Sequence, residues 1–218
     1  MTGPNRRADR SAEERALDEV LAAILPPGIH ADCRVIRDGD QALLLPDEAA
    51  SITSKRNPMR DASGAARHVA RGLLNQAGLA VAPLMKSPDG APVWPLGVVG
   101  SMAHDDDFAV AAVASAASFS GLGIDVEPGE PLAEDVAAIV RMPGDVLDGV
   151  EERLASRLLF AAKEAVYKAV FPRDNVILDF EDVVIDFTRG EGRTRTGRNV
   201  KLVYILKPRI VVLAFEPV

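Results

Sequence analysis

The segment GLGIDVE at residues 121–127 alternates between two kinds of side chain with a period of two. The apolar positions are Leu122, Ile124 and Val126. Successive side chains of a β-strand point to opposite faces, so the apolar set would be buried while Asp125 and Glu127 share the other face. The segment therefore predicts a strand that carries two carboxylates on one side.

Further strands and three long helices are predicted around this segment. The strands cover residues 98–103, 108–114, 183–187, 200–206 and 210–215, with shorter ones around 35–36 and 42–45. The first helix begins at a capping box formed by Ser11 and Glu14. The other two helices cover about residues 61–77 and 151–171, and the last of them ends at Pro172.

This order of elements predicts an α+β fold built from two similar halves. Residues 1–120 would form the N-terminal half and residues 121–218 the C-terminal half. Each half would contain one long helix and a small sheet.

The composition indicates a folded globular protein and excludes several other classes. The 218 residues are 48% hydrophobic and 26% charged, which is too apolar for a disordered chain. No run reaches the 18 apolar residues of a membrane span, and no secretory signal is evident. A net charge of −7 argues against a general nucleic-acid-binding surface, and a single cysteine, Cys33, excludes an internal disulfide. We therefore expect a protein of the reducing cytosol.

Asp125 and Glu127 are candidate metal ligands, because two carboxylates on one strand face repel each other unless a cation lies between them. Oxygen ligands of this kind suit Mg²⁺. The alternative is a half-exposed strand with a polar outer face, and the pattern alone favours this plainer interpretation.

The helix at about residues 154–171 is mostly apolar but contains Lys163, Glu164 and Lys168. Charged side chains are rarely buried unless they are paired or bind a ligand. Glu164 and Lys168 could form an exposed pair across one helical turn, worth only ~0.3–0.5 kcal/mol. Alternatively, Glu164 is a third metal ligand and the lysines bind phosphate. The residues alone favour neither interpretation.

Arg60, Arg67 and Arg71 recur at intervals that place them within about 20° of one line on a helix. Such a basic stripe on an acidic protein is a candidate phosphate-binding face, although a solvated helix face is the commoner outcome. The acidic run at residues 105–107, which follows His104, is interpreted as a solvated turn between two strands.

Four strings occur in one order along the chain and resemble the motifs of a known family. They are RHVAR at 67–71, GAPVWPLGVVGSMAH at 90–104, GIDVE at 123–127 and FAAKEAVYK at 160–168. Together they resemble the 4′-phosphopantetheinyl transferases of the surfactin/enterobactin type, and the first two are typical of the enterobactin-like branch. The resemblance covers about residues 55–187, and the combination is more specific than any one motif.

This resemblance implies a pseudo-twofold pair of α/β halves with the active site in the cleft between them. It implies an enzyme of the holo-[acyl-carrier-protein] synthase type. Mg²⁺, or Mn²⁺ in its place, would assist transfer of the 4′-phosphopantetheine arm of coenzyme A to a carrier-protein serine. The implied metal ligands are Asp125, Glu127 and Glu164. The implied coenzyme A contacts are Arg60, Arg67, Lys86, His104, Lys163 and Lys168.

Two residues have implied catalytic roles. Glu164 would accept the serine proton, directly or through a metal-bound water, and Lys168 would stabilise the leaving oxygen of 3′,5′-ADP. The expected partners are coenzyme A and an acyl or peptidyl carrier protein. No nucleic acid or membrane partner is expected, and the chain is expected to be monomeric and cytoplasmic.

Two other functions are consistent with the same residues. One is a different Mg²⁺-dependent phosphotransferase that acts on a nucleotide. The other is a coenzyme A-binding or carrier-binding module without catalysis, against which the complete set of carboxylates and Lys168 argues, because binding alone does not need a metal site.

Overall fold

The computed structural model describes residues 4–218, with the backbone alone for residues 4–11. The helices are α1 (Pro4–Ile24), α2 (Pro46–Ser51), α3 (Asn57–Gln76), α4 (Glu134–Val140) and α5 (Glu152–Asp174), with two short 3₁₀ helices, η1 (Asp40–Leu43) and η2 (Phe180–Asp182). The strands are β1 (Ile29–Val35), β2 (Val98–His104), β3 (Phe108–Ser115), β4 (Phe119–Glu127), β5 (Val183–Asp186), β6 (Glu191–Thr194), β7 (Asn199–Ile205) and β8 (Ile210–Pro217).

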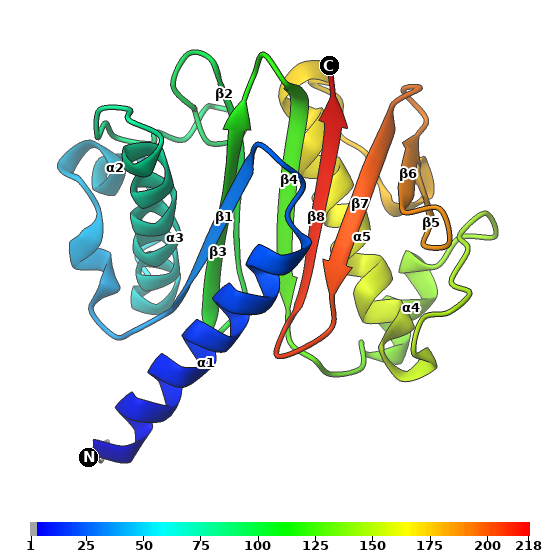
Figure 1. Ribbon diagram of the computed structural model, residues 1–218, viewed down its shortest axis with the longest axis horizontal. Coiled ribbons are helices and arrows are strands. Elements are labelled where there is room, and N and C mark those ends of the chain that lie inside the picture. The colour runs from blue at the N-terminus through cyan, green and yellow to red at the C-terminus, as the bar shows by residue number, and fades with distance from the viewer. Residues whose placement is uncertain (1–3) are drawn as a thin grey trace.

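The strands of the described residues form two antiparallel sheets that lie side by side, which confirms the predicted α+β class. The first sheet has the order β1-β3-β2 and the second has the order β4-β8-β7-β6-β5. Helix α3 covers the first sheet, α5 covers the second, and α1 lies across the opposite face (Figure 1). Each sheet therefore pairs with one long helix, and the chain crosses between the sheets after Ser115.

The alternation of side chains on β4 places its two faces in different environments. The apolar positions predicted from the sequence lie in one buried cluster with Leu17 and Leu21 of α1. Gly121 and Gly123 point the other way, toward α5. The second face was expected to be half-exposed, but α5 covers it, and Asp125 is only 5% exposed. The burial of Asp125 is therefore a property of the tertiary fold that the strand pattern did not predict.

Two predictions of secondary structure are wrong: the strand at residues 42–45 and the end of the last long helix. Residues 42–45 do not form a strand, because η1 begins after Gly39 and the Asp61 side chain of α3 accepts a hydrogen bond from the Gln41 amide (2.9 Å). The last long helix does not end at Pro172 but continues to Asp174. A proline in the last turn keeps a helical φ and removes only one amide donor, so the helix can continue through it.

The first long helix starts earlier than the predicted capping box, since α1 begins at Pro4. The Ser11 side chain of that box lies outside the described side chains. The second helix begins at Asn57, before the predicted 61, because Pro58 in its first turn needs no helical amide donor. Within the described part of the chain, no helix is both long enough and apolar enough to cross a bilayer.

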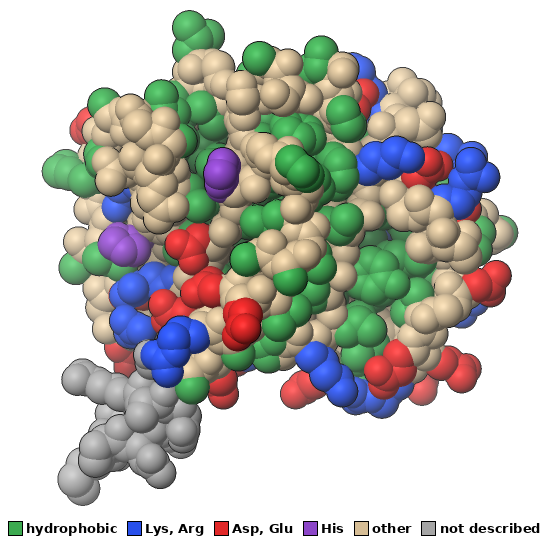
Figure 2. Space-filling view, viewed as in Figure 1, with side chains coloured by type: hydrophobic (Ala, Val, Ile, Leu, Met, Phe, Trp, Pro, Cys, Tyr) green, Lys and Arg blue, Asp and Glu red, His purple; other side chains and the backbone are tan. Residues whose placement is uncertain are grey.

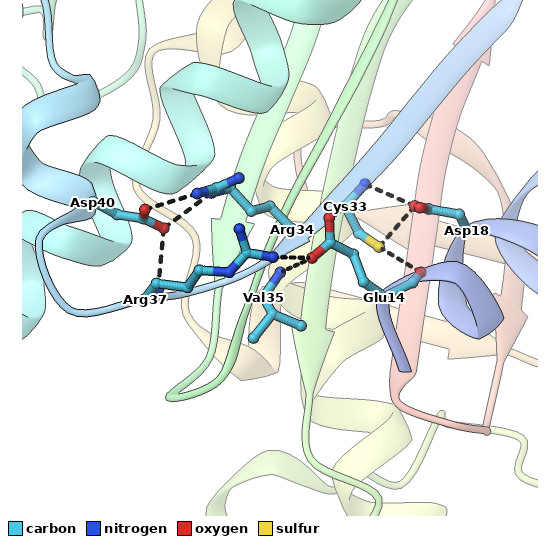
Figure 3. Close-up of polar contacts among 7 residues, drawn as sticks. All are labelled: Glu14, Asp18, Cys33, Arg34, Val35, Arg37 and Asp40. Atoms are coloured by element: carbon cyan, nitrogen blue, oxygen red, sulfur yellow. Dashed lines mark hydrogen bonds and ion pairs between the residues drawn. The ribbon is translucent and has the colours of Figure 1, made fainter. Parts of the chain in front are cut away.

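Helix α1 is attached to β1 by polar contacts as well as by its buried leucines (Figure 3). Asp18 Oδ1 accepts hydrogen bonds from the Cys33 thiol (2.8 Å) and the Cys33 amide (3.2 Å). Glu14 Oε2 accepts hydrogen bonds from the Val35 amide (3.4 Å) and from Arg37 (3.1 Å). On this face of the molecule acidic and basic side chains are intermixed (Figure 2). Because the cluster under α1 includes strands of both sheets, these contacts help to hold the two halves together.

We expect Asp18 to make the stability of this attachment pH-dependent. Burial raises the pKa of Asp18 from 3.8 to about 6, so between these pH values the folded chain binds a proton that the unfolded chain releases. The stabilisation is therefore present below about pH 4 and is lost as the pH rises through 6. Between pH 4 and pH 7 the free energy of unfolding of Asp18→Asn should rise by about 1 kcal/mol relative to that of the parent. This is less than the full pKa difference would give, because Asp18 is only half-buried and solvent screens its charge.

Urea unfolding of both proteins at pH 4 and pH 7 measures this difference. Asp38→Asn makes the same isosteric change at an exposed position and is the control. If Asp18→Asn and the parent lose stability in parallel between the two pH values, Asp18 does not titrate in this range.

Candidate active site between the two halves

Helix α5 lies unusually close to β4, and this contact positions the first pair of functional side chains. A Cβ atom on Gly123 would lie 1.9 Å from the Ala165 carbonyl oxygen, and one on Gly121 would lie 2.5 Å from that of Ala169. The close approach lets Lys168 reach across to β4, where its Nζ lies 2.6 Å from Asp125 Oδ1. The glycines of the GLGIDVE segment thus set the geometry of this ion pair.

Asp125 and Glu127 lie on β4, and Glu164 lies on α5, which packs against that strand. Burial raises the pKa of all three carboxyl groups, and the charge of Asp125 raises those of Glu127 and Glu164 further. Asp125 is therefore close enough to repel both Glu127 and Glu164. A cation between them would relieve both the repulsion and the desolvation.

Two basic residues of α5 currently supply part of that positive charge. Lys168 pairs with Asp125, and Arg157 Nη1 lies 2.7 Å from Glu127 Oε2. Arg157 also donates hydrogen bonds to the carbonyls of Glu130 and Pro131, so it fixes the chain just after β4. Sequence reasoning missed Arg157, although its spacing of seven residues from Glu164 places both on one side of a helix.

The carboxylates have the donor chemistry of a magnesium site but are not arranged as a finished one. Among the described residues, no three His, Cys, Asp or Glu side chains converge closely enough to hold a metal ion. Asp125 Oδ2, however, is buried and accepts no hydrogen bond from any described residue. A buried carboxylate oxygen without a partner is costly, and a metal ion would satisfy it. The chemistry of these oxygen donors therefore fits Mg²⁺, and Asp125 Oδ2 is the atom that a cation would satisfy.

A pocket of about 300 Å³ opens between α3 and β2. Its basic lining residues are Arg67, Lys86 and His104. Arg67 is only 7% exposed and donates hydrogen bonds to the carbonyls of Leu84 (3.1 Å) and Ser63 (3.4 Å). Because no carboxylate pairs with this guanidinium among the described side chains, the pocket suits an anionic ligand.

His104 connects the pocket with the carboxylate cluster. It lies at the exposed end of β2, where partial desolvation and the charge of Lys168 lower its pKa, while Asp125 raises it. These influences place His104 near both residues. A neighbouring pocket of about 280 Å³, which Lys168 lines, shares Gly90, Pro92 and Met102 with this one. The basic pocket therefore adjoins the pair of Lys168 and Asp125.

The basic stripe on α3 is not a single phosphate-binding face, which corrects that prediction. Arg71 is buried in a two-oxygen contact with Glu48 (2.7 and 2.5 Å) and is part of the fold. Arg60 donates long hydrogen bonds to the carbonyls of Ile52 (3.5 Å) and Ser54 (3.4 Å), which belong to the pocket rim. The arginines are aligned along the helix as expected, but Arg71 pairs with a residue of α2 and Arg60 binds carbonyls of the loop that follows α2.

Lys163 is not placed for direct contact with coenzyme A. Its side chain is fully buried, its Nζ lies 2.9 Å from Asp145 Oδ2, and it donates a hydrogen bond to the Phe180 carbonyl (2.9 Å). Lys163 instead forms part of the wall of a second pocket of about 190 Å³, which Glu164 and Tyr167 also line.

Comparison with known proteins identifies both halves. The family model described as the 4′-phosphopantetheinyl transferase N-terminal domain matches residues 31–114, and that of the 4′-phosphopantetheinyl transferase superfamily matches residues 121–209. The chain is 34% identical over 193 residues to 4′-phosphopantetheinyl transferase PptT of Mycobacterium tuberculosis, and this match covers 85% of each protein. It is 36% identical over 181 residues to 4′-phosphopantetheinyl transferase Npt of Nocardia iowensis, covering 82% of this chain and 81% of that one.

A third relative is more similar over a shorter region. The chain is 42% identical over 151 residues to 4′-phosphopantetheinyl transferase Svp of Streptomyces mobaraensis, a match that covers 66% of this chain and 61% of the relative. With two relatives matched over more than four-fifths of their length, and with both halves matched by family models, the chain belongs to the 4′-phosphopantetheinyl transferase family.

Proposed function

We propose that this chain transfers the 4′-phosphopantetheine arm of coenzyme A to a serine of an acyl or peptidyl carrier protein and releases 3′,5′-ADP. The observation that carries the proposal is that the pocket lined by Arg67, Lys86 and His104 adjoins a pocket lined by Lys168, which pairs with Asp125. Coenzyme A has a 3′-phosphate and a pyrophosphate, so it needs positive charge at two separated places. The site offers both.

Arg67, Lys86 and His104 would bind the 3′-phosphate, and Arg60 would hold the rim of the pocket through its two carbonyl contacts. The pyrophosphate would then lie beside Lys168. Mg²⁺, or Mn²⁺ in its place, would be held by Asp125, Glu127 and Glu164 and would neutralise charge on the pyrophosphate.

Glu164 is the residue best suited to accept the proton of the carrier serine. Its burial and the nearby charge of Asp125 raise its pKa, which strengthens it as a base. As the serine oxygen bonds to the phosphorus that bears pantetheine, the bond from that phosphorus to the leaving oxygen breaks. Lys168 donates a hydrogen bond to this leaving oxygen.

Intact-mass measurement of a carrier protein incubated with this chain, coenzyme A and Mg²⁺ tests the proposal. The mass of the carrier should rise by one phosphopantetheine arm. Phosphorylation of an added nucleotide acceptor without modification of the carrier would instead indicate another phosphotransferase, and binding without any product would indicate a non-catalytic module.

The finer classification is part of the same proposal. The string at residues 90–104 supports the surfactin/enterobactin type and its enterobactin-like branch. We propose a monomeric cytoplasmic enzyme of the holo-[acyl-carrier-protein] synthase type, with residues 1–120 as the coenzyme-binding half and residues 121–218 as the half with the metal ligands. Its acceptors would be carriers of polyketide, non-ribosomal peptide or siderophore synthesis.

Arg67→Ala should separate two forms of the substrate. The KM for coenzyme A should rise roughly 10–100-fold, because a hydrogen bond to a charged group is worth about 1.5–3 kcal/mol. The KM for dephospho-coenzyme A, which lacks the 3′-phosphate, should change far less. Steady-state kinetics with both substrates measure the split, and equal losses would show that Arg67 does not bind this phosphate.

Glu164→Gln should reduce turnover by ~10²–10⁴-fold at saturating Mg²⁺, with a much smaller change in the KM for coenzyme A. The amide has nearly the shape of the carboxylate but cannot take the serine proton. A Mg²⁺ titration at saturating coenzyme A and carrier protein is the measurement. Complete recovery at high Mg²⁺ would leave Glu164 with the role of a metal ligand only.

A further inference from the structure

An arginine in the β7–β8 turn reaches across to the β2–β3 turn of the other half. Arg209 Nη1 lies 3.0 Å from Asp105 Oδ2, and its Nη2 contacts Asp107 Oδ2. The guanidinium lies 5.1 Å from the centre of the Phe108 ring. The side chains of Arg209 and Asp105 are 17% and 6% exposed. The contact between Arg209 and Asp105 is therefore a shielded link between the two sheets, whereas Asp107 is 56% exposed and forms the outer part of the link.

The other oxygen of Asp105 shapes its own turn. Asp105 Oδ1 accepts hydrogen bonds from the amides of Asp107 (2.8 Å) and Phe108 (2.6 Å). His104, the preceding residue, lines the pocket assigned above to the 3′-phosphate. The Asp105 side chain thus binds the amides of its own turn and Arg209, while His104 lines the pocket.

Arg209 also lies next to the strand pair that carries the metal-binding carboxylates. It precedes β8, in which Ile210 pairs with Glu127 and Val212 pairs with Asp125. Asp105 lies close enough to raise the pKa of both carboxyl groups. Because Asp105 directly follows His104, which lines the pocket, the acidic turn would add negative charge near a polyanion bound there.

We propose that Arg209 is a positioning residue for the transfer reaction. It keeps Asp105 and Asp107 neutralised and turned away from the substrate, so that the pocket beside His104 accepts a polyanion. The inference rests on the proposed function, because it takes that pocket as the binding site for coenzyme A. It also gives a role to the acidic run, which the sequence interpreted only as a solvated turn.

Calorimetric titration with 3′,5′-ADP tests this role without requiring turnover. Arg209→Ala should weaken 3′,5′-ADP binding roughly tenfold, because two like charges beside the ligand lose their counter-ion. In the triple variant with Arg209→Ala, Asp105→Asn and Asp107→Asn, affinity should return to within about threefold of the parent. Asparagine at position 105 keeps an oxygen for the turn hydrogen bonds, so the triple variant isolates the charge.

Arg189→Ala is the matched control. Arg189 is an exposed arginine of the β5–β6 turn whose carboxylate contact is with Glu191, so the control removes the same charge far from the two turns. Should Arg209→Ala fail to fold, Arg209→Lys keeps the charge but only one donor group, and it should bind 3′,5′-ADP about two- to threefold more weakly than the parent.

Three results would overturn the inference: parental affinity in Arg209→Ala, an equal loss in Arg189→Ala, or no recovery in the triple variant. In the Arg209→Lys experiment, affinity equal to that of Arg189→Ala or of the parent overturns it as well. If the parent itself does not bind 3′,5′-ADP, the proposed function is wrong, and the inference is withdrawn with it.

Discussion

Asp125→Asn is expected to remove nearly all transfer activity while leaving the protein at least as stable as the parent. The side chain is buried, one oxygen pairs with Lys168, and the other has no hydrogen-bond partner. Burial raises the pKa of Asp125, which shows that the folded state disfavours its charge. A neutral amide of the same shape can still accept the hydrogen bond from Lys168 and removes much of the desolvation penalty.

The activity should fall by ~10³-fold or more, because the amide cannot neutralise a metal ion and the pyrophosphate would face Glu127 and Glu164 with less positive charge between them. The melting temperature should rise by about 2–4 °C if the gain is ~1 kcal/mol. Asp148→Asn, an exposed site with the same chemical change, is the control and should alter neither quantity. A collapse of the melting temperature, or normal activity per folded molecule, would contradict the role of Asp125.

This expectation differs from the one that the strand pattern supports alone. Period-two alternation is a local property, so the sequence predicted both the strand and the shared face of Asp125 and Glu127. Whether that face meets solvent depends on what packs on it, and α5 lies more than 25 residues further along the chain. The pattern therefore predicted which way the side chains of the strand point, but not that Asp125 is buried.

The charged residues of α5 show a second limit. Lysines in an apolar helix predicted that each must be paired or bind a ligand. The structure separates them, since Lys168 meets Asp125 in the active site whereas Lys163 meets Asp145 in the loop before the helix. Nothing in the spacing distinguishes these partners, because both lie on segments that reach α5 only in the folded chain.

The arginines of α3 show the same limit in another form. Their alignment on one helix line was predicted, but only Arg67 lines the pocket, and Arg71 pairs with the fully buried Glu48. A basic stripe indicates where side chains point along a helix, but it does not indicate whether another element, here α2, supplies a carboxylate for them. Tertiary contacts thus decide which members of a charged motif are free to bind substrate.

Gly123→Ala is expected to have the largest effect on folding of any single methyl group added to the active-site strand. The new Cβ would lie 1.9 Å from the Ala165 carbonyl oxygen and 2.7 Å from the Ala169 amide nitrogen. Both atoms belong to the backbone of α5, whose Ala165 and Ala169 lie in the hydrophobic cluster between this helix and the second sheet, so no flexible side chain can move aside. The helix would have to shift away from β4 and open that core.

Such overpacking should destabilise the protein by about 3 kcal/mol or more, which lowers the melting temperature by about 10 °C in a chain of this length. The molecules that still fold should also lose activity, because a displaced α5 lengthens the 2.6 Å contact between Lys168 and Asp125 and moves Glu164 away from β4. Gly72→Ala is the control, since a Cβ on that α3 glycine meets nothing within 4 Å and alanine favours the helix by up to ~1 kcal/mol. Thermal unfolding and transfer assays on both variants separate the two effects.

A Gly123→Ala protein that melts within 2 °C of the parent, roughly the shift expected for a change below 1 kcal/mol, would mean that α5 does not pack tightly against this strand. The glycines of the motif would then have no part in placing Lys168 beside Asp125.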